Sequence, residues 1–114
     1  MSARSGNAPL NVESVTAAGS VQSDAAAIPS KSSPAFVLAT GDGTVGISLP
    51  KATKGKLFYV KNLAAGSALK VWPATGDAIN ALSANSAISM AAATSAVFIA
   101  KDSTTWYTVP LLPS

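Results

Sequence analysis

From residue 35 onward, glycine and proline divide the sequence into short runs of sheet-favouring residues. Gly41, Pro50, Pro73 and Pro110 each directly follow one of these runs. Short strands separated by such turn residues are typical of all-β domains. The runs cover residues 35–40, 44–49, 56–61, 68–72, 86–90, 96–100 and 104–109. We therefore predict an all-β fold, either a small antiparallel β-sandwich or a jelly-roll-like barrel.

Residues 78–93 allow one alternative, because this stretch is rich in alanine, which favours helices. Asparagine and serine interrupt it, and its apolar residues do not follow a helical stripe. A short helix over 78–93 is therefore the alternative to strands in this region.

Residues 1–34 differ in composition from the rest of the chain, because they lack aromatic residues and show no sustained apolar period. Such a stretch cannot bury enough surface to order itself. We interpret it either as a disordered leader or as an extended arm that becomes ordered on a partner. The predicted organisation is thus an N-terminal arm over 1–34 and a β domain over 35–114, which should fold without the arm. The predicted partner-binding residues of the arm are its aliphatic ones, Leu10, Val12, Val15, Val21 and Ile28.

The chain contains no cysteine and no histidine. This composition excludes disulfides, thiol nucleophiles and the usual zinc and haem ligand sets. Residues 41–46 match the dinucleotide pattern G-x-G-x-x-G, but the following residues predict a strand that ends at Pro50 and not the helix that the pattern requires. We expect no enzyme activity, no cofactor, no metal and no small-molecule substrate. A carboxylate pair drawn from Asp42, Asp77 and Asp102 is the remaining route to catalysis.

Charge patterning points to neither nucleic acid nor membrane. The net charge is +3, and the lysines between residues 51 and 70 resemble a solvated strand rim or a surface complementary to an acidic protein. The longest apolar stretch, 87–100, is shorter than the ~20 residues that a spanning helix needs. We therefore expect neither a nucleic-acid nor a membrane partner.

The large aromatic side chains are candidates either for the core or for a protein interface, where tryptophan and tyrosine are enriched. The candidate interface anchors are Tyr59, Trp72, Trp106 and Tyr107.

Most of the chain resembles a small β-structured module of tailed-phage virion proteins. The resemblance lies in residues 49–50, 59–62, 71–80, 97–100 and 106–109, and in the preceding segment 15–22. It implies a capsid decoration (cement) protein or a related head-fibre or tail module, which is typically a homotrimer.

From this resemblance and the missing catalytic residues, we expect a virion structural protein. It would be made in the host cytoplasm, bind the major capsid protein on the outer capsid surface and reinforce contacts between capsomers. The alternative is a receptor- or glycan-binding module of a head fibre or tail, for which Tyr59, Trp72 or Trp106 would supply an aromatic platform.

Overall fold

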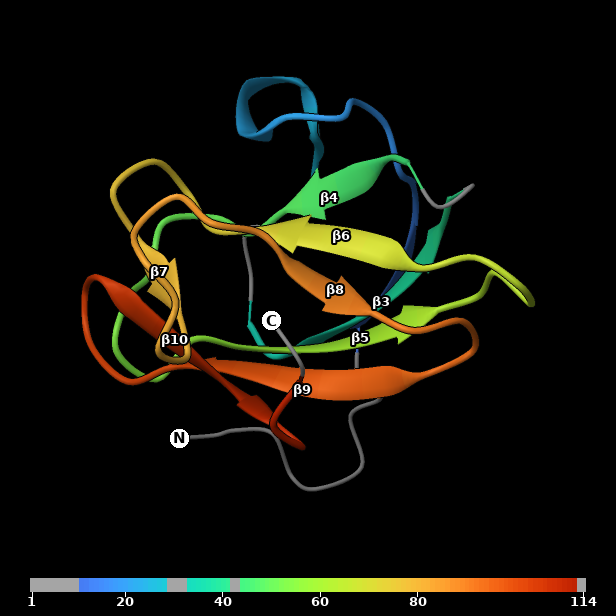
Figure 1. Ribbon diagram of the computed structural model, residues 1–114. Coiled ribbons are helices and arrows are strands. Elements are labelled where there is room, and N and C mark those ends of the chain that lie inside the picture. The colour runs from blue at the N-terminus through green and yellow to red at the C-terminus, as the bar shows by residue number, and fades with distance from the viewer. Residues whose placement is uncertain (1–10, 29–32, 42–43, 113–114) are drawn as a thin grey trace, which may run out of the picture.

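The computed structural model describes residues 11–28, 33–41 and 44–112, which form ten strands in two sheets and one short 3-10 turn, η1 (Gln22–Asp24) (Figure 1). The six-stranded sheet has the order β1 (Asn11–Thr16), β3 (Ala35–Thr40), β5 (Leu57–Asn62), β9 (Ser95–Ala100), β10 (Thr105–Val109) and β7 (Ala78–Ile79). The four-stranded sheet has the order β2 (Ala26–Ala27), β4 (Gly46–Ser48), β6 (Leu69–Trp72) and β8 (Ile88–Met90). Among the described residues, no helix is long and apolar enough to cross a membrane.

The chain passes from one sheet to the other at almost every connection. Strands β1, β3 and β5 lie side by side and parallel in the larger sheet, and β2, β4 and β6 do the same in the smaller one. Each pair of successive strands is therefore one coil stacked on the previous coil, a winding that resembles a β-solenoid. Strands β8 and β9 then pair antiparallel with β6 and β5, and β10 pairs antiparallel with β9 and parallel with β7.

The predicted all-β class is confirmed, but the predicted antiparallel sandwich or jelly roll does not match the observed pairing. Five of the eight strand pairs are parallel. Side-chain alternation indicates which face of a strand is buried, but it does not identify the neighbouring strand. The helix considered over 78–93 does not form, since this stretch contains β7, β8 and turns.

Residues 11–28 belong to the two sheets and are not a separate arm. All six residues of β1 pair with β3, and the backbone amide of Ile28 donates to the carbonyl of Ser48 at 3.1 Å. The side chains of Val15 and Ile28 are buried in the core. The predicted boundary at residue 34 is therefore wrong for this part of the chain. A segment with few aliphatic residues cannot become ordered alone, but the burial of Val15 and Ile28 against the rest of the core stabilises residues 11–28 in this fold.

The core lies between the two sheets. The aromatic rings of Phe58 and Trp106 lie 6.0 Å apart in it, and both side chains are fully buried. A third aromatic side chain, Phe98, is also fully buried. Most of the remaining core side chains are aliphatic, notably Val37, Ile47, Val60, Leu69, Val71, Ile79 and Ile88. Each such side chain contributes about 1.5–3 kcal/mol of transfer free energy.

Glycine allows two strands of the smaller sheet to approach closely. A Cβ built on Gly46 would lie 2.6 Å from the backbone carbonyl oxygen of Lys70. The last glycine of the G-x-G-x-x-G match therefore permits strand packing at this point.

Two buried polar side chains hold the loops at the ends of the sheets. The Asn62 amide donates to the carbonyl of Ser67 at 2.9 Å and to that of Met90 at 3.3 Å. The Asp77 carboxylate accepts from the backbone amide of Ala52 at 2.8 Å and from the ammonium group of Lys51. These bonds satisfy buried polar groups that would otherwise be costly.

Candidate functional site

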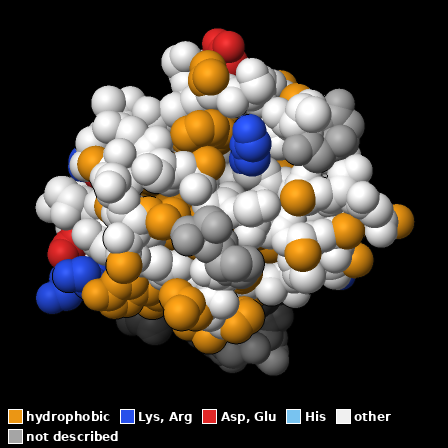
Figure 2. Space-filling model, viewed as in Figure 1, with side chains coloured by type: hydrophobic (Ala, Val, Ile, Leu, Met, Phe, Trp, Pro, Cys, Tyr) orange, Lys and Arg blue, Asp and Glu red, His pale blue; other side chains and the backbone are white. Residues whose placement is uncertain are grey.

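The outward face of the six-stranded sheet is the candidate site. The inward face of this sheet packs on the core, so a soluble sheet of this kind would normally carry polar residues on its other face. Instead, large apolar side chains on this face remain well exposed, among them Val12 by 56%, Tyr59 by 41% and Val109 by 61%. Figure 2 shows apolar side chains gathered over the lower part of the molecule, where Figure 1 places β9 and β10.

Strand register aligns five of these side chains into one line across the sheet. Each is the register partner of the next, and they come from β1, β3, β5, β9 and β10 in that order. We call this line the apolar row, and it consists of Val12, Phe36, Tyr59, Val97 and Val109. Its members are in reach of one another because directly opposite Cβ atoms lie about 4.5–5.5 Å apart.

A second line of apolar residues lies beside the first. Leu57 is the register partner of Ile99, which in turn is the partner of Tyr107. Tyr107 is 46% exposed, and the Lys101 ammonium lies 5.8 Å from the centre of its ring. We call the apolar row together with these three residues and Leu38 the apolar face.

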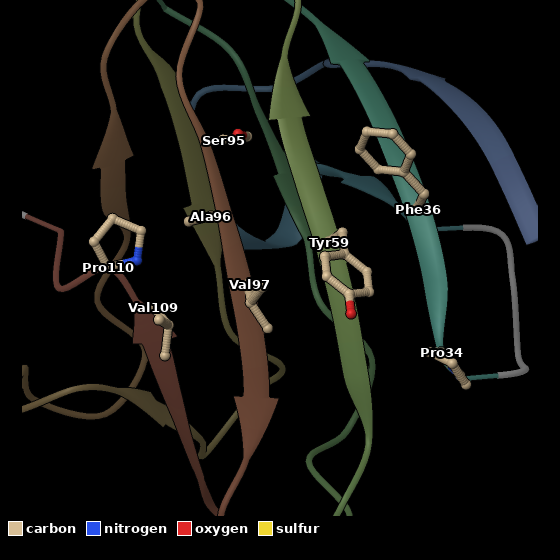
Figure 3. A pocket seen from close by; sticks show the side chains of 8 residues that line it. All are labelled: Pro34, Phe36, Tyr59, Ser95, Ala96, Val97, Val109 and Pro110. Carbon is tan, nitrogen blue, oxygen red and sulfur yellow. The ribbon is translucent and has the colours of Figure 1, made fainter. Parts of the chain in front are cut away.

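A groove of about 480 Å³ lies across the apolar row. Figure 3 shows Pro34 and Phe36 on one side of it and Val109 and Pro110 on the other, with Tyr59 and Val97 between them. The Phe36 and Tyr59 rings meet edge to face, with their centres 6.4 Å apart. This arrangement fixes the two largest side chains of the groove relative to each other.

The polar groups near the groove are few. Among the eight described residues that line it, only Ser95 and Tyr59 carry a polar side-chain atom. Lys61 is the one charged residue at an outward position of the five long strands described here, and its ammonium donates to the backbone carbonyl of Ala93 at 2.9 Å. The surface is therefore suited to an apolar ligand surface and not to a strongly charged one.

An ion pair lies at one end of the apolar face, in the turn between β9 and β10. The Asp102 carboxylate accepts from the backbone amides of Thr104 and Thr105 at 2.9 Å and lies 3.1 Å from the Lys101 ammonium. The Thr104 hydrogen bond and then the Lys101 contact lower the pKa of Asp102 to about 2. In turn, the hydrogen bond to the Asp102 carboxylate and then its negative charge raise the pKa of the Lys101 ammonium.

The residues predicted from sequence for the arm have three different positions. Val12 belongs to the apolar row, and Val21 is exposed in the turn before η1. Val15 and Ile28 are core residues, so their side chains are not available to a partner in this fold. Leu10 lies outside the described residues.

The four predicted interface anchors fall into two groups, one exposed on the apolar face and one away from it. Tyr59 and Tyr107 are exposed on the apolar face. Trp106 is fully buried, and Trp72 is half-buried on β6 of the other sheet. Trp106 points into the core from β10, whereas Trp72 alternates with the buried Val71 on β6, so neither tryptophan lies on the apolar face.

The sequence reasoning missed Phe36, Val97 and Val109 as site residues. A signal was present: β3 and β9 carry apolar residues at consecutive positions, so both faces of each strand are apolar. Such a strand is normally covered on both sides.

The acids considered for catalysis are not gathered into one site in the described part of the chain. Asp77 is fully buried and accepts hydrogen bonds from the Ala52 backbone amide and the Lys51 ammonium. Asp102, in contrast, is exposed in the β9–β10 turn. Asp42 lies outside the described residues. Within those residues, no group of three or more acidic, histidine or cysteine side chains could hold a metal ion.

Comparisons of the chain with protein-family models, curated proteins and solved structures give no match.

Proposed function

We propose that this chain is a structural protein of a tailed-phage particle that acts by binding other protein subunits. In this proposal it is made in the host cytoplasm, sits on the outer capsid surface as a decoration protein, contacts the major capsid protein and reinforces the contacts between capsomers. The phage assignment is supported by the sequence resemblance. The binding role is supported by one structural observation, the apolar face of the six-stranded sheet.

An exposed apolar patch favours a protein-binding role for physical reasons. Soluble monomers rarely leave large contiguous apolar patches open, and such patches commonly mark interaction sites. The apolar row spans five strands and includes the exposed aromatic ring of Tyr59. Tyrosine on a rigid strand supplies a large contact area at a small cost in side-chain entropy.

The fold supports a scaffold role as well. We infer that the winding is a short β-solenoid, because five of its eight strand pairs are parallel. Coils stacked in this way hold the strands of one sheet side by side, so that contact residues on its face keep fixed positions.

A glycan-binding role is the second candidate, because Tyr59 and Tyr107 present exposed rings. Sugar recognition also requires several hydrogen-bonding groups beside the ring, since a buried hydroxyl without a partner is costly. The groove supplies Ser95 and the Tyr59 hydroxyl among its described lining residues. This sparse set of polar groups favours a protein partner over a sugar.

Capsids assembled without this protein provide the test. The purified protein is mixed with them and the amount that co-sediments with capsids is measured. We expect saturable binding that strengthens the capsid against heat or chelation. Absence of binding to such capsids, together with binding to a cell-surface glycan, would contradict the decoration role and favour the second candidate.

A further inference from the structure

Lysines gather at one end of the six-stranded sheet, beside the apolar face. Three come from the loop before β5 and one from the turn between β9 and β10. We call these four residues the lysine rim: Lys51, Lys54, Lys56 and Lys101. The described part of the chain contains two other lysines, Lys61 and Lys70, so the rim holds most of its positive charge.

Backbone hydrogen bonds hold the two segments of the rim together. The Gly55 amide donates to the Ala100 carbonyl, and the Ala100 amide donates to the Lys56 carbonyl, each at 2.9 Å. The Lys51 ammonium donates to the Ser103 carbonyl at 2.8 Å. Figure 1 shows both segments at the left end of the molecule. The four lysines therefore form one cluster, although they come from two distant parts of the sequence.

The acids at this end of the molecule are already paired. Lys51 forms an ion pair with the buried Asp77, and the Lys101 ammonium lies 3.1 Å from the Asp102 carboxylate. The other two lysines of the rim have neither an ion pair nor a side-chain hydrogen bond with the described residues. Four lysines against two aspartates leave this end with a net charge of +2.

The lysine rim and the apolar face are continuous. The Lys101 ammonium lies over the exposed ring of Tyr107, and Lys56 directly precedes Leu57 at the start of β5. Tyr107 and Leu57 are joined by Ile99, which is the register partner of both. A protein that covers this line of the apolar face therefore also comes within reach of the lysines.

We propose that the lysine rim binds carboxylates of the protein that covers the apolar face, so that this partner is acidic at the margin of its apolar contact. The inference rests on the proposed function, because it gives the chemistry of the partner of that face. A polar border around an apolar centre is the usual arrangement of a protein interface. Opposite charges at such a border mainly accelerate association and fix the orientation of docking.

Two other partners fit this region less well. A second copy of the chain also carries a net charge of +3, and its Asp77 and Asp102 are paired with its own lysines. Two copies would therefore repel each other and offer no free carboxylate from this end. Nucleic acid would bind the lysines through its phosphates, but protein surfaces that bind DNA are polar and strongly positive. It would leave the apolar side chains beside the rim uncovered, whereas an acidic protein surface matches both parts of the region.

The first experiment measures the rate at which the full chain associates with capsids assembled without this protein. Raising the salt concentration from about 50 to about 300 mM should slow the association of wild type by about tenfold, because salt screens exposed charges. Lys54→Glu reverses an unpaired charge of the rim and should slow association by about fivefold at the lower salt concentration.

The matched control for this variant is Lys70→Glu. Lys70 lies on β6 of the other sheet, and its substitution lowers the net charge by the same amount, from +3 to +1. Because Lys70 is not part of the rim, this change should slow association by less than about twofold.

The second experiment tests carboxylate binding without a capsid. Wild type and both variants are titrated with poly-L-glutamate and, separately, with a short DNA duplex at low salt. We expect wild type to bind poly-L-glutamate at least as tightly as the duplex. Lys54→Glu should weaken binding to poly-L-glutamate by about threefold more than Lys70→Glu does, which is the scale expected for an exposed ion pair.

Three results would overturn the proposal. These are association rates that do not depend on salt, equal slowing by Lys54→Glu and Lys70→Glu, or tighter binding of the DNA duplex that Lys54→Glu abolishes. The last result would assign the rim to phosphate groups. Capsid binding that Lys54→Glu leaves unchanged would reject this inference and leave the proposed function standing. Absence of capsid binding, together with binding to poly-L-glutamate that Lys54→Glu weakens, would reject the decoration role instead, so the two failures can be told apart.

Discussion

Replacing Ile28 by alanine tests whether residues 11–28 are part of the folded body. Ile28 lies just beyond β2, is 6% exposed and packs in the core between the sheets. The change removes three buried carbon groups at about 0.8 kcal/mol each, or about 2.4 kcal/mol before any cavity is counted. A site at the end of a sheet can partly collapse, so we expect a loss of about 2–3 kcal/mol of unfolding free energy, at the low end for such substitutions.

The control lies in the same segment. Val21→Ala is chemically similar, but Val21 is 48% exposed and should change the unfolding free energy by less than about 0.5 kcal/mol. Unfolding in urea can be followed by the fluorescence of the tryptophans, because Trp106 is fully buried in the folded state. With a slope of about 2 kcal/mol per molar urea, the Ile28→Ala midpoint should fall by about 1 M.

The result that would refute this reasoning is equality of the two variants. If Ile28→Ala unfolds at the same urea concentration as Val21→Ala and wild type, the segment behaves as an arm outside the cooperative core. In that case, residues 35–114 should also fold alone. The structure leads to the opposite expectation, because removal of β1 and β2 would expose the edges of β3 and β4 and destabilise the remaining strands.

Two further predictions concern a close strand contact and an exposed carboxylate. Gly46→Ala should cost about 1–3 kcal/mol in thermal or urea unfolding, because its Cβ would press against the Lys70 backbone. Gly66→Ala, which has open space, should not destabilise by more than about 0.5 kcal/mol, and a similar loss for both would contradict the packing argument. The folded-state pKa of Asp102 is about 2, below its ordinary 3.8, so its stabilising contribution is present above about pH 4 and is lost as the pH falls toward 2. Asp102→Asn should therefore flatten the acid side of the curve of unfolding free energy against pH. An unchanged curve would contradict the stabilising contribution of the hydrogen bond from Thr104 to the Asp102 carboxylate.

Strand positions after residue 35 could be predicted from sequence because their signals are local. The run at 35–40 coincides with β3, and the runs at 68–72 and 96–100 match β6 and β9 to within one residue. Proline and glycine end strands through their own backbone geometry, without help from distant residues. The short strands β2 and β7 were missed because two residues carry too little pattern to detect.

Three of the nine residues of the apolar face, Val12, Tyr59 and Tyr107, could be anticipated from sequence, and the other six could not. Tyr59 and Tyr107 were singled out as large aromatics, and both are exposed on the apolar face. Phe36 and Val97 resembled core residues, because an apolar side chain on a strand has the same local pattern whether it faces the core or an open surface. Trp106 showed the reverse: its residue type suggested an interface, and its strand places it in the core.

By itself, the sequence determined the all-β class, the main turns and a residue inventory without cysteine or histidine, since each depends on residue type or on neighbours within a few positions. Tertiary structure alone decided that β1 joins β3 in parallel, that Ile28 enters the core and that five side chains align across one open face. The physical reason is that strand pairing and burial are non-local. A strand with a period of two specifies two faces, and only its packing partners determine which face meets the core and which remains exposed.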